Sequence, residues 1–355
     1  MLIDLQIPSA NLKANFFEYH LQFKIPAKTS RDTLTKKTIY IIQIWDAQNP
    51  SFVAQGECSP LLGLSVDNPN NYTEILQALC EDIQNYKFWL QLGLKNHPSI
   101  KMGLEMAILN LKNQKPHVYF PSDFTLGKKS IEINGLIWMG EYEGMRQQII
   151  HKISQGFTCV KLKIGGIDFD NELKLLELIR KDFSEKDIEL RLDANGSMKN
   201  DEVFYKLDKL SKYHIHSIEQ PIATKQWEFM HDLCAQSPIN IALDEELIGV
   251  EEYTEKEKLI RAIQPKYLIF KPSLLGGFVA TKEWIDLCAQ YQIKWWITSA
   301  LESNLGLNAI AQFAAITNNT MPQGLGTGGL FTNNLEAPIQ LVGKTIQFTG
   351  SELFR

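Results

Sequence analysis

Cys159-Val160-Lys161-Leu162-Lys163 is a short apolar run that ends in a lysine. Four later runs have the same form, and each closes on one ionisable residue, at successive intervals of 30, 26, 25 and 27 residues. The closing residues are Asp193, Glu219, Asp244 and Lys271. Helical periodicity follows the runs, as over residues 171–183 and 278–290. A repeated strand, loop and helix of this length predicts an α/β fold, a TIM-type (β/α) barrel of parallel strands.

The other strands of the barrel are expected on either side of this repeat. Residues 131–137 predict the first strand and residues 293–298 the seventh, while the eighth position falls on the short, glycine-rich stretch 321–326. In such a barrel the residues at the carboxyl ends of the strands meet at one mouth, where active sites form. We therefore expect the five closing side chains to face one place.

The chain before the barrel has a different pattern. Strands over residues 17–25 and 38–45 predict a hairpin with an exposed polar loop, and helical periodicity covers residues 71–90 and 100–111. The predicted division is therefore an α+β capping domain (1–125), the barrel (126–325) and a C-terminal segment that returns to the cap (326–355).

Composition restricts the classes of function. Hydrophobic residues make up 44% of the chain and charged residues 22%, and a formal net charge of −5 gives no attraction to nucleic acid. The first residues lack the pattern of a signal peptide, and no long apolar run suggests membrane insertion, so we expect a cytoplasmic protein. Five widely spaced cysteines without a C-x-x-C pair predict reduced thiols. No pattern fixes the oligomeric state.

Three acids that close consecutive strands predict a metal site. Asp193, Glu219 and Asp244 are expected to lie side by side, and such a cluster repels itself unless a cation neutralises it. A ligand set made only of oxygens suits a hard divalent ion, so we expect Mg²⁺, with Mn²⁺ as a substitute. Zinc is disfavoured because no His or Cys joins the set.

Lysines flank the three acids on both sides. Lys163 on the second strand and Lys271 on the sixth are expected to face each other beside the metal. Lys161 lies two residues before Lys163 on the same face of the strand, and its charge is expected to lower the pKa of Lys163 so that it serves as a general base. A divalent ion with two opposed lysines suits removal of a proton next to a carboxylate, a step that requires strong electrostatic stabilisation.

Five short motifs together resemble the muconate-lactonising subgroup of the enolase superfamily, position by position. They are Val160-Lys161-Leu162-Lys163, Leu192-Asp193-Ala194-Asn195-Gly196, Ile218-Glu219-Gln220-Pro221, Ala242-Leu243-Asp244-Glu245 and Phe270-Lys271-Pro272. The resemblance covers nearly the whole chain and implies a modified, enolase-like barrel with an N-terminal capping domain. Asn195 and Glu245 are expected either to orient the ligands or to cap the helices that follow them.

Within the subgroup, residues 56–61, 298–306 and 324–328 are most similar to members that act in menaquinone biosynthesis. This likeness implies a Mg²⁺-assisted syn dehydration of 2-succinyl-6-hydroxy-2,4-cyclohexadiene-1-carboxylate to o-succinylbenzoate. In that reaction Lys163 removes the proton alpha to the carboxylate and the metal holds the enediolate. Protonated Lys163 then assists departure of hydroxide, while Lys271 stabilises the enediolate from the other face.

The resemblance also implies how a small carboxylate substrate is held. Thr298, with Ser299 beside it, matches a hydroxyl position that contacts the succinyl carboxylate, and residues 26–37 match a mobile loop that covers the substrate. Residues 196–199 lack a bulky side chain that often follows the first acid, and Thr298 stands where serine is more usual. These departures affect the expected substrate contacts and leave the reaction class unchanged.

Two other functions fit parts of the pattern. An N-succinylamino acid racemase or related epimerase of the same subgroup would use Lys163 and Lys271 as a two-base pair. Dipeptide epimerases carry an Asp-x-Asp near strand eight, which residues 324–326 lack. A catalytically silent barrel that only binds a ligand predicts at least one missing acid or lysine, whereas all five are present.

Overall fold

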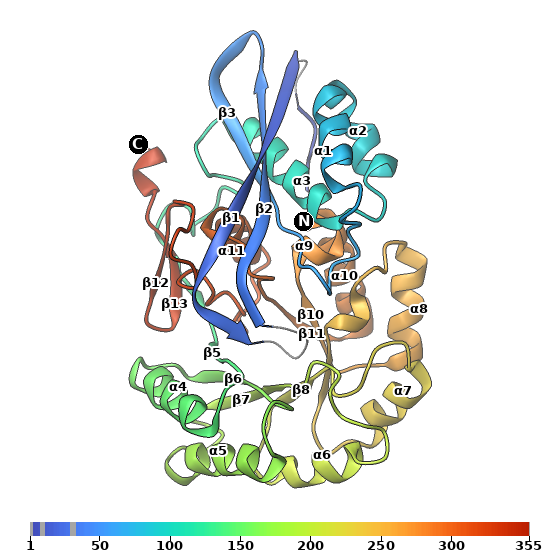
Figure 1. Ribbon diagram of the computed structural model, residues 1–355, viewed down its shortest axis with the longest axis vertical. Coiled ribbons are helices and arrows are strands. Elements are labelled where there is room, and N and C mark those ends of the chain that lie inside the picture. Colours follow the sequence, from blue (N-terminus) through green and yellow to red (C-terminus); the bar gives the residue numbers. More distant parts are fainter. Residues whose placement is uncertain (1–2, 8–10, 29–32, 355) are drawn as a thin grey trace.

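The computed structural model describes residues 3–7, 11–28 and 33–354 of the 355-residue chain. An antiparallel sheet with its helices forms the upper part of the molecule in Figure 1, and a ring of strands and helices forms the lower part. Within the described parts, no helix is both long and apolar enough to cross a membrane. The five cysteines are free thiols.

The capping domain is built on three antiparallel strands in the order β1-β2-β3. The strands are β1 (Leu12–Lys28), β2 (Thr33–Asp46) and β3 (Asn49–Cys58). The helices beside them are α1 (Tyr72–Glu81), α2 (Tyr86–Phe88) and α3 (Pro98–Asn113), with a 3₁₀ turn at Ile83–Asn85 and a π turn at Trp89–Gly93. Nearly every residue of α3 is buried, because this helix lies between the sheet of the cap and the barrel.

The prediction of a simple hairpin with a long exposed loop is wrong in two respects. Residues 56–58 end a third strand, and β1 and β2 extend well into the stretch 26–37. Lys37 in particular is a strand residue, 6% exposed, because its ammonium group finds acceptors inside the protein. Residues 29–32, the centre of the expected mobile loop, lie outside the described residues.

The barrel is a curled sheet of seven parallel strands in the order β11-β10-β9-β8-β7-β6-β5. The strands are β5 (Gly135–Ile137), β6 (Cys159–Lys163), β7 (Glu189–Asp193), β8 (Ser217–Glu219), β9 (Ile241–Leu243), β10 (Tyr267–Phe270) and β11 (Lys294–Ile297). The helices are α4 (Tyr142–Ser154), α5 (Phe169–Asp182), α6 (Val203–Ser211), α7 (Trp227–Gln236), α8 (Tyr253–Ile263), α9 (Pro272–Leu275), α10 (Gly277–Tyr291) and α11 (Asn304–Ile316), with a 3₁₀ turn at Glu245–Leu247. The helices surround the sheet in Figure 1, which confirms the predicted modified barrel.

Residues 323–324 occupy the eighth position of the ring without forming a named strand. Gln323 pairs with Ile133 and Gly324 with Thr298 through isolated parallel bridges. A Cβ atom on Gly324 would lie 2.3 Å from Thr298 Oγ1, so only glycine permits this close approach. The stretch closes the gap between the first and seventh strands, as its place in the sequence predicted.

The predicted first strand over residues 131–137 is divided in the structure. Only β5 belongs to the barrel, whereas β4 (Ile131–Glu132) joins a small sheet in the order β12-β13-β4. The other strands of that sheet are β12 (Ile339–Val342) and β13 (Thr345–Phe348), and a 3₁₀ turn follows at Ser351–Phe354. The interruption at residues 133–134 lets one segment serve two sheets.

The segment after residue 326 contacts the cap as well as β4. Lys24 N donates to Leu330 O at 2.9 Å and Thr332 N donates to Gln22 O at 2.9 Å. The rings of Phe23 and Phe331 lie 4.7 Å apart between these bonds. The exact division of the chain at residues 125 and 325 remains a prediction.

Candidate active site

The barrel strands place the closing residues at one end of the sheet. In the parallel register Lys163 pairs with Asp193, and Asp193 pairs with Glu219. Asp244 directly follows β9, and Lys271 directly follows β10. The three acids are almost fully buried, with exposed fractions of 1%, 1% and 2% along the chain. The structure thus brings together the five residues that the spacing singled out.

Lysines of β6 bond directly to the buried acids. Lys161 Nζ lies 3.0 Å from Asp193 Oδ2 and 2.7 Å from Glu219 Oε2. Lys163 Nζ donates to the same Asp193 Oδ2 at 2.9 Å, so the two lysines share one carboxylate oxygen. The charge of Lys161, which was expected to act on Lys163, is balanced here by two carboxylates.

Burial and charge oppose each other in this network. Burial alone would raise the pKa of Asp193, but Lys161 and Lys163 outweigh it and hold the pKa below its ordinary value. Burial, and after it the charge of Asp193, raises the pKa of Glu219 well above its ordinary value. For Lys161, burial would lower the pKa, but Asp193 and Glu219 raise it above its ordinary value. The two carboxylates therefore favour the cationic form of Lys161.

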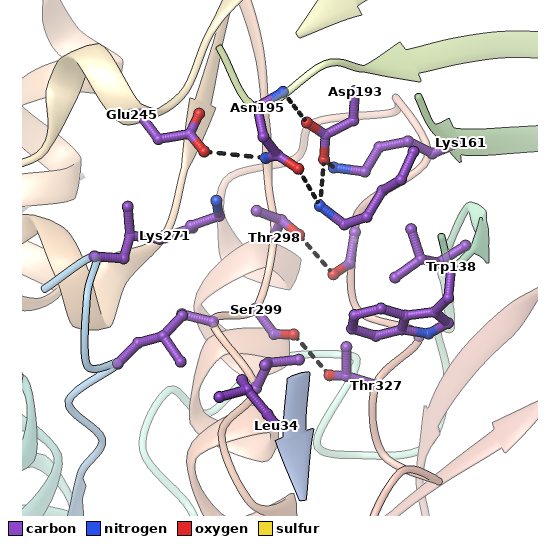
Figure 2. Close-up of a pocket in the computed structure, with 18 of the residues that line it drawn as sticks. Leu34, Trp138, Lys161, Asp193, Asn195, Glu245, Lys271, Thr298, Ser299 and Thr327 are labelled. Carbon is purple, nitrogen blue, oxygen red and sulfur yellow. Dashed lines mark hydrogen bonds and ion pairs between the residues drawn. The ribbon is translucent and has the colours of Figure 1, made fainter. Parts of the chain in front are cut away.

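Lys271 approaches the site from the other side of the barrel. Its Nζ forms an ion pair with Asp244 Oδ2, and Figure 2 shows it across the pocket from Lys161. Burial would lower the pKa of Lys271, but Asp244, followed by Glu245 and Glu219, raises it above its ordinary value. This lysine is also held as a cation.

Asn195 and Glu245 continue the hydrogen-bond network from Lys163. Asn195 Oδ1 accepts from Lys163 Nζ at 2.8 Å, and Asn195 Nδ2 donates to Glu245 Oε1 at 3.0 Å. Asn195 has a φ of 45°, in the left-handed region. Asn195 contacts Lys163 through its side chain, and its backbone N–H donates to Asp193 Oδ1 at 3.2 Å, so it bonds to an acid of the expected metal site as well.

Hydroxyl groups line the opposite wall of the site. Thr298 Oγ1 donates to Gly324 O at 2.9 Å, and Ser299 Oγ lies 2.6 Å from Thr327 Oγ1 (Figure 2). All three hydroxyl residues are at most 8% exposed. The pair formed by Ser299 and Thr327 can turn its protons toward an anion.

A pocket of about 250 Å³ joins these groups. It is lined by eight of the ten predicted site residues, and the other two, Glu219 and Asp244, are buried beside them. Its remaining walls are formed by residues that were not predicted individually as site residues, although several lie in the stretches 26–37, 298–306 and 324–328. They are Leu34, Leu61, Leu62, Leu64, Asn134, Leu136, Trp138, Ala300, Leu301, Gly324, Gly326 and Thr327. The alternation of residues 134, 136 and 138, along and directly beside β5, was the available signal for three of them.

The acids fit a metal ion by their chemistry. In the described structure no three His, Cys, Asp or Glu side chains already form a metal-binding group, and one oxygen of each acid bonds to a lysine instead. Glu219 Oε1, however, is buried and has no hydrogen-bond partner among the described residues. An unpaired buried carboxylate oxygen is costly, and a cation would remove that cost. A set of three carboxylates suits Mg²⁺.

Comparisons with known proteins agree on the family. The family described as enolase C-terminal domain-like matches residues 144–347. The o-succinylbenzoate synthase of Desulfotalea psychrophila is 42% identical over 365 residues, which cover 94% of this chain and 98% of that protein.

Solved structures show the same relationship. The crystal structure of MenC from Desulfotalea psychrophila LSv54 has a TM-score of 0.83 at 39% identity and covers 95% of this chain and 100% of that one. A dipeptide epimerase from Enterococcus faecalis V583, complexed with Mg and a dipeptide, has a TM-score of 0.80 at 19% identity, covering 95% of this chain and 97% of that one. The second likeness shows the fold alone.

Proposed function

Because the chain belongs to the o-succinylbenzoate synthase family of the enolase superfamily, we propose that it is a hydro-lyase of menaquinone biosynthesis in the cytoplasm. Its substrate is the cyclohexadiene carboxylate that bears a hydroxyl and a succinyl group, and its product is o-succinylbenzoate. The observation that carries the proposal is the placement of Lys163 and Lys271 on two sides of one pocket beside three buried acids.

Lys163 acts as the general base. A neutral amine has two N–H donors and one lone pair, and the contacts with Asp193 and Asn195 use both donors. The lone pair is then free to take the proton alpha to the substrate carboxylate. The C–O bond breaks next, and the Lys163 ammonium returns this proton to the departing hydroxide to give water. One base is sufficient because the proton and the hydroxide leave from the same face.

The acids and Lys271 stabilise the charge that develops. Asp193, Glu219 and Asp244 would hold the ion, Mg²⁺ first and Mn²⁺ as a substitute. When bound there, the ion supplies positive charge beside the substrate carboxylate as its alpha proton leaves. Lys271 lies across the pocket from Lys161, and as an ammonium it stabilises the enediolate from the other face.

The far end of the pocket holds the rest of the substrate. Thr298 and Ser299 are proposed to donate to the succinyl carboxylate, with Thr327 as the partner of Ser299. The apolar side chains of Leu136 and Trp138 line the same pocket and suit the ring. The lysines at one end of the pocket and the hydroxyl groups at the other can each bind a carboxylate, and the apolar side chains between them can contact the ring. This arrangement matches a substrate that carries a carboxylate at each end.

Turnover of the proposed substrate tests this function directly. Purified protein with Mg²⁺ is mixed with the cyclohexadiene carboxylate, and loss of the diene absorbance is followed with and without a chelator. We expect turnover that stops when the ion is removed and returns when Mg²⁺ is restored. No turnover, together with exchange of the alpha deuterium of an N-succinyl amino acid, would establish the racemase instead.

A further inference from the structure

A lysine outside the catalytic network is buried between the cap and the barrel. Lys37, on β2, is 6% exposed, and its Nζ donates to Ser59 Oγ at 2.7 Å, Ala300 O at 2.7 Å and Leu301 O at 3.0 Å. These three bonds use all the N–H donors of the ammonium group. One side chain of the cap therefore binds two consecutive carbonyl groups of the barrel.

The barrel loop between β11 and α11 is also held from its own side. Glu302 is fully buried, and its Oε2 accepts from Ala300 N at 2.7 Å while its other oxygen accepts from Ser273 Oγ. Ala300 is thus fixed through both its N–H and its carbonyl group. Burial lowers the pKa of Lys37, and the nearby negative charges of Glu302 and Glu57 offset part of that lowering.

The backbone at this point adopts a conformation that needs such support. Leu301 has a φ of 64°, in the left-handed region that residues with a side chain rarely occupy. Strained residues of this kind persist where the surroundings fix them, and they cluster at ligand sites. Lys37 bonds to the carbonyl of this residue and of the residue before it.

The segments that Lys37 joins all reach the substrate pocket. Ala300 and Leu301 line it together with Ser299, and Leu34 lines it from the start of the strand that carries Lys37. Leu61 lines it two residues beyond Ser59. In Figure 2, Leu34 lies with Ser299 and Thr327 at the end of the pocket away from Asp193. Lys37 does not line the pocket with them; it binds behind the wall that they form.

We propose that Lys37 is a positioning residue. It clamps the cap to the pocket wall, formed by residues 298–301, that binds the succinyl carboxylate of the substrate. The assignment of the carboxylate to this wall rests on the proposed function. By fixing the carbonyl groups of residues 300 and 301, Lys37 sets where the neighbouring Ser299 hydroxyl points. It touches neither the metal ligands nor Lys163, so it acts on substrate binding and leaves proton transfer to the other lysines.

Lys37→Met tests the clamp because methionine keeps the length and apolar stem while removing the three donors. We expect KM to rise about tenfold or more while kcat changes by less than about threefold, since the lost interaction contributes to uniform binding. Hydrogen–deuterium exchange should accelerate about tenfold or more in a peptide covering residues 298–306, where the Lys37 bonds end. The two readouts are independent.

Lys256→Met is the matched control. Lys256 is also fully buried, and it donates to Ala280 O at 3.2 Å and to Glu283 Oε2 at 2.6 Å, away from the pocket. It should leave both KM and the exchange of residues 298–306 unchanged. An equal rise in KM for this control would overturn the clamp, because general loss of a buried cation would then explain the effect.

Three other outcomes also test the role of Lys37. A folded Lys37→Met protein with the KM and exchange of the wild type overturns the proposal. If Lys37→Met does not fold, Lys37→Gln takes its place, because the amide nitrogen of glutamine is one bond nearer the backbone and so lengthens the contacts with the carbonyl groups of residues 300 and 301. Unchanged KM and exchange in that variant overturn the proposal as well. If the wild type shows no turnover, the proposed function fails, while faster exchange in Lys37→Met would still establish the clamp.

Discussion

Two of the regions that bury charged groups bind them in different ways. At the barrel mouth, Lys161 and Lys163 bond to carboxylates and an amide of neighbouring strands, so the contacts run between side chains. At the junction of cap and barrel, Glu57 and Glu105 accept from backbone N–H groups of α11 and α10. Contacts between side chains can rearrange when a ligand arrives, whereas contacts to the backbone hold helices in place. The first region suits chemistry and the second stability.

Lys163→Ala gives the largest expected effect and separates the two regions. Removing the base should lower kcat by about a thousandfold or more, within the usual range of general-base contributions. The free energy of unfolding should change little, because the backbone contacts of the junction remain. Diene absorbance measures the first quantity and urea denaturation the second.

The control for this variant is Lys174→Ala on α5. Lys174 is exposed and bonds only to Asn171 among the described residues, so its loss should leave kcat unchanged. Retained dehydration in Lys163→Ala would remove Lys163 from the role of base. Unfolding of that variant would show that the mouth contributes to stability after all.

The same contrast explains what the sequence could predict. The charges of the mouth lie at regular intervals at the ends of similar runs, so a repeat of about one βα unit already places Asp193, Glu219 and Asp244 together. The junction has no such period. Glu57 bonds to Ser303 across 246 residues and Glu105 to Phe278 across 173, and neither pair belongs to a repeated unit.

The ends of individual strands show the same difference between repeated patterns and long-range contacts. A loop that covers the substrate was expected over residues 26–37, but β2 begins at Thr33 and the polar side chain of Lys37 is buried, a state that depends on acceptors brought in by the barrel. The eighth position was predicted from the glycine-rich stretch 321–326, but its irregular pairing follows from the close approach of Gly324 to Thr298. Patterns repeated along the chain predict local structure, while contacts between distant segments decide the exceptions.

Glu57→Ala is expected to damage the junction more than the mouth. The Glu57 carboxylate is fully buried and accepts from Ser303 N at 2.9 Å, Gly306 N at 2.8 Å and the Ser303 hydroxyl. Alanine leaves these donors buried without an acceptor, which should lower the free energy of unfolding by about 3 to 5 kcal/mol. Urea denaturation monitored by circular dichroism measures the loss.

Glu18→Ala on the exposed face of β1 is the control, and it should change stability by less than about 0.5 kcal/mol. A loss equally small in Glu57→Ala would mean that water replaces the carboxylate, and the junction would then be less dependent on buried charge than its contacts indicate.

Glu105→Gln is expected to have the smallest effect, and one that depends on pH. Burial raises the pKa of Glu105 to about 7 from an ordinary 4.5, opposed by the charge of Lys101 and supported by that of Glu283. An acid with a raised pKa in the folded state stabilises the fold below pH 4.5, and this contribution is lost as pH rises through about 7. Relative to Glu105→Gln, the free energy of unfolding of the wild type should therefore fall by at most about 3 kcal/mol over that window and then level off.

Glutamine at position 105 retains an oxygen that accepts from Phe278 N, so the variant keeps this bond but has no group that titrates. Parallel urea denaturations of both proteins from about pH 5 to about pH 8 measure the difference. Curves that stay parallel throughout would show that Glu105 does not titrate in this range and that its backbone donors alone keep it ionised.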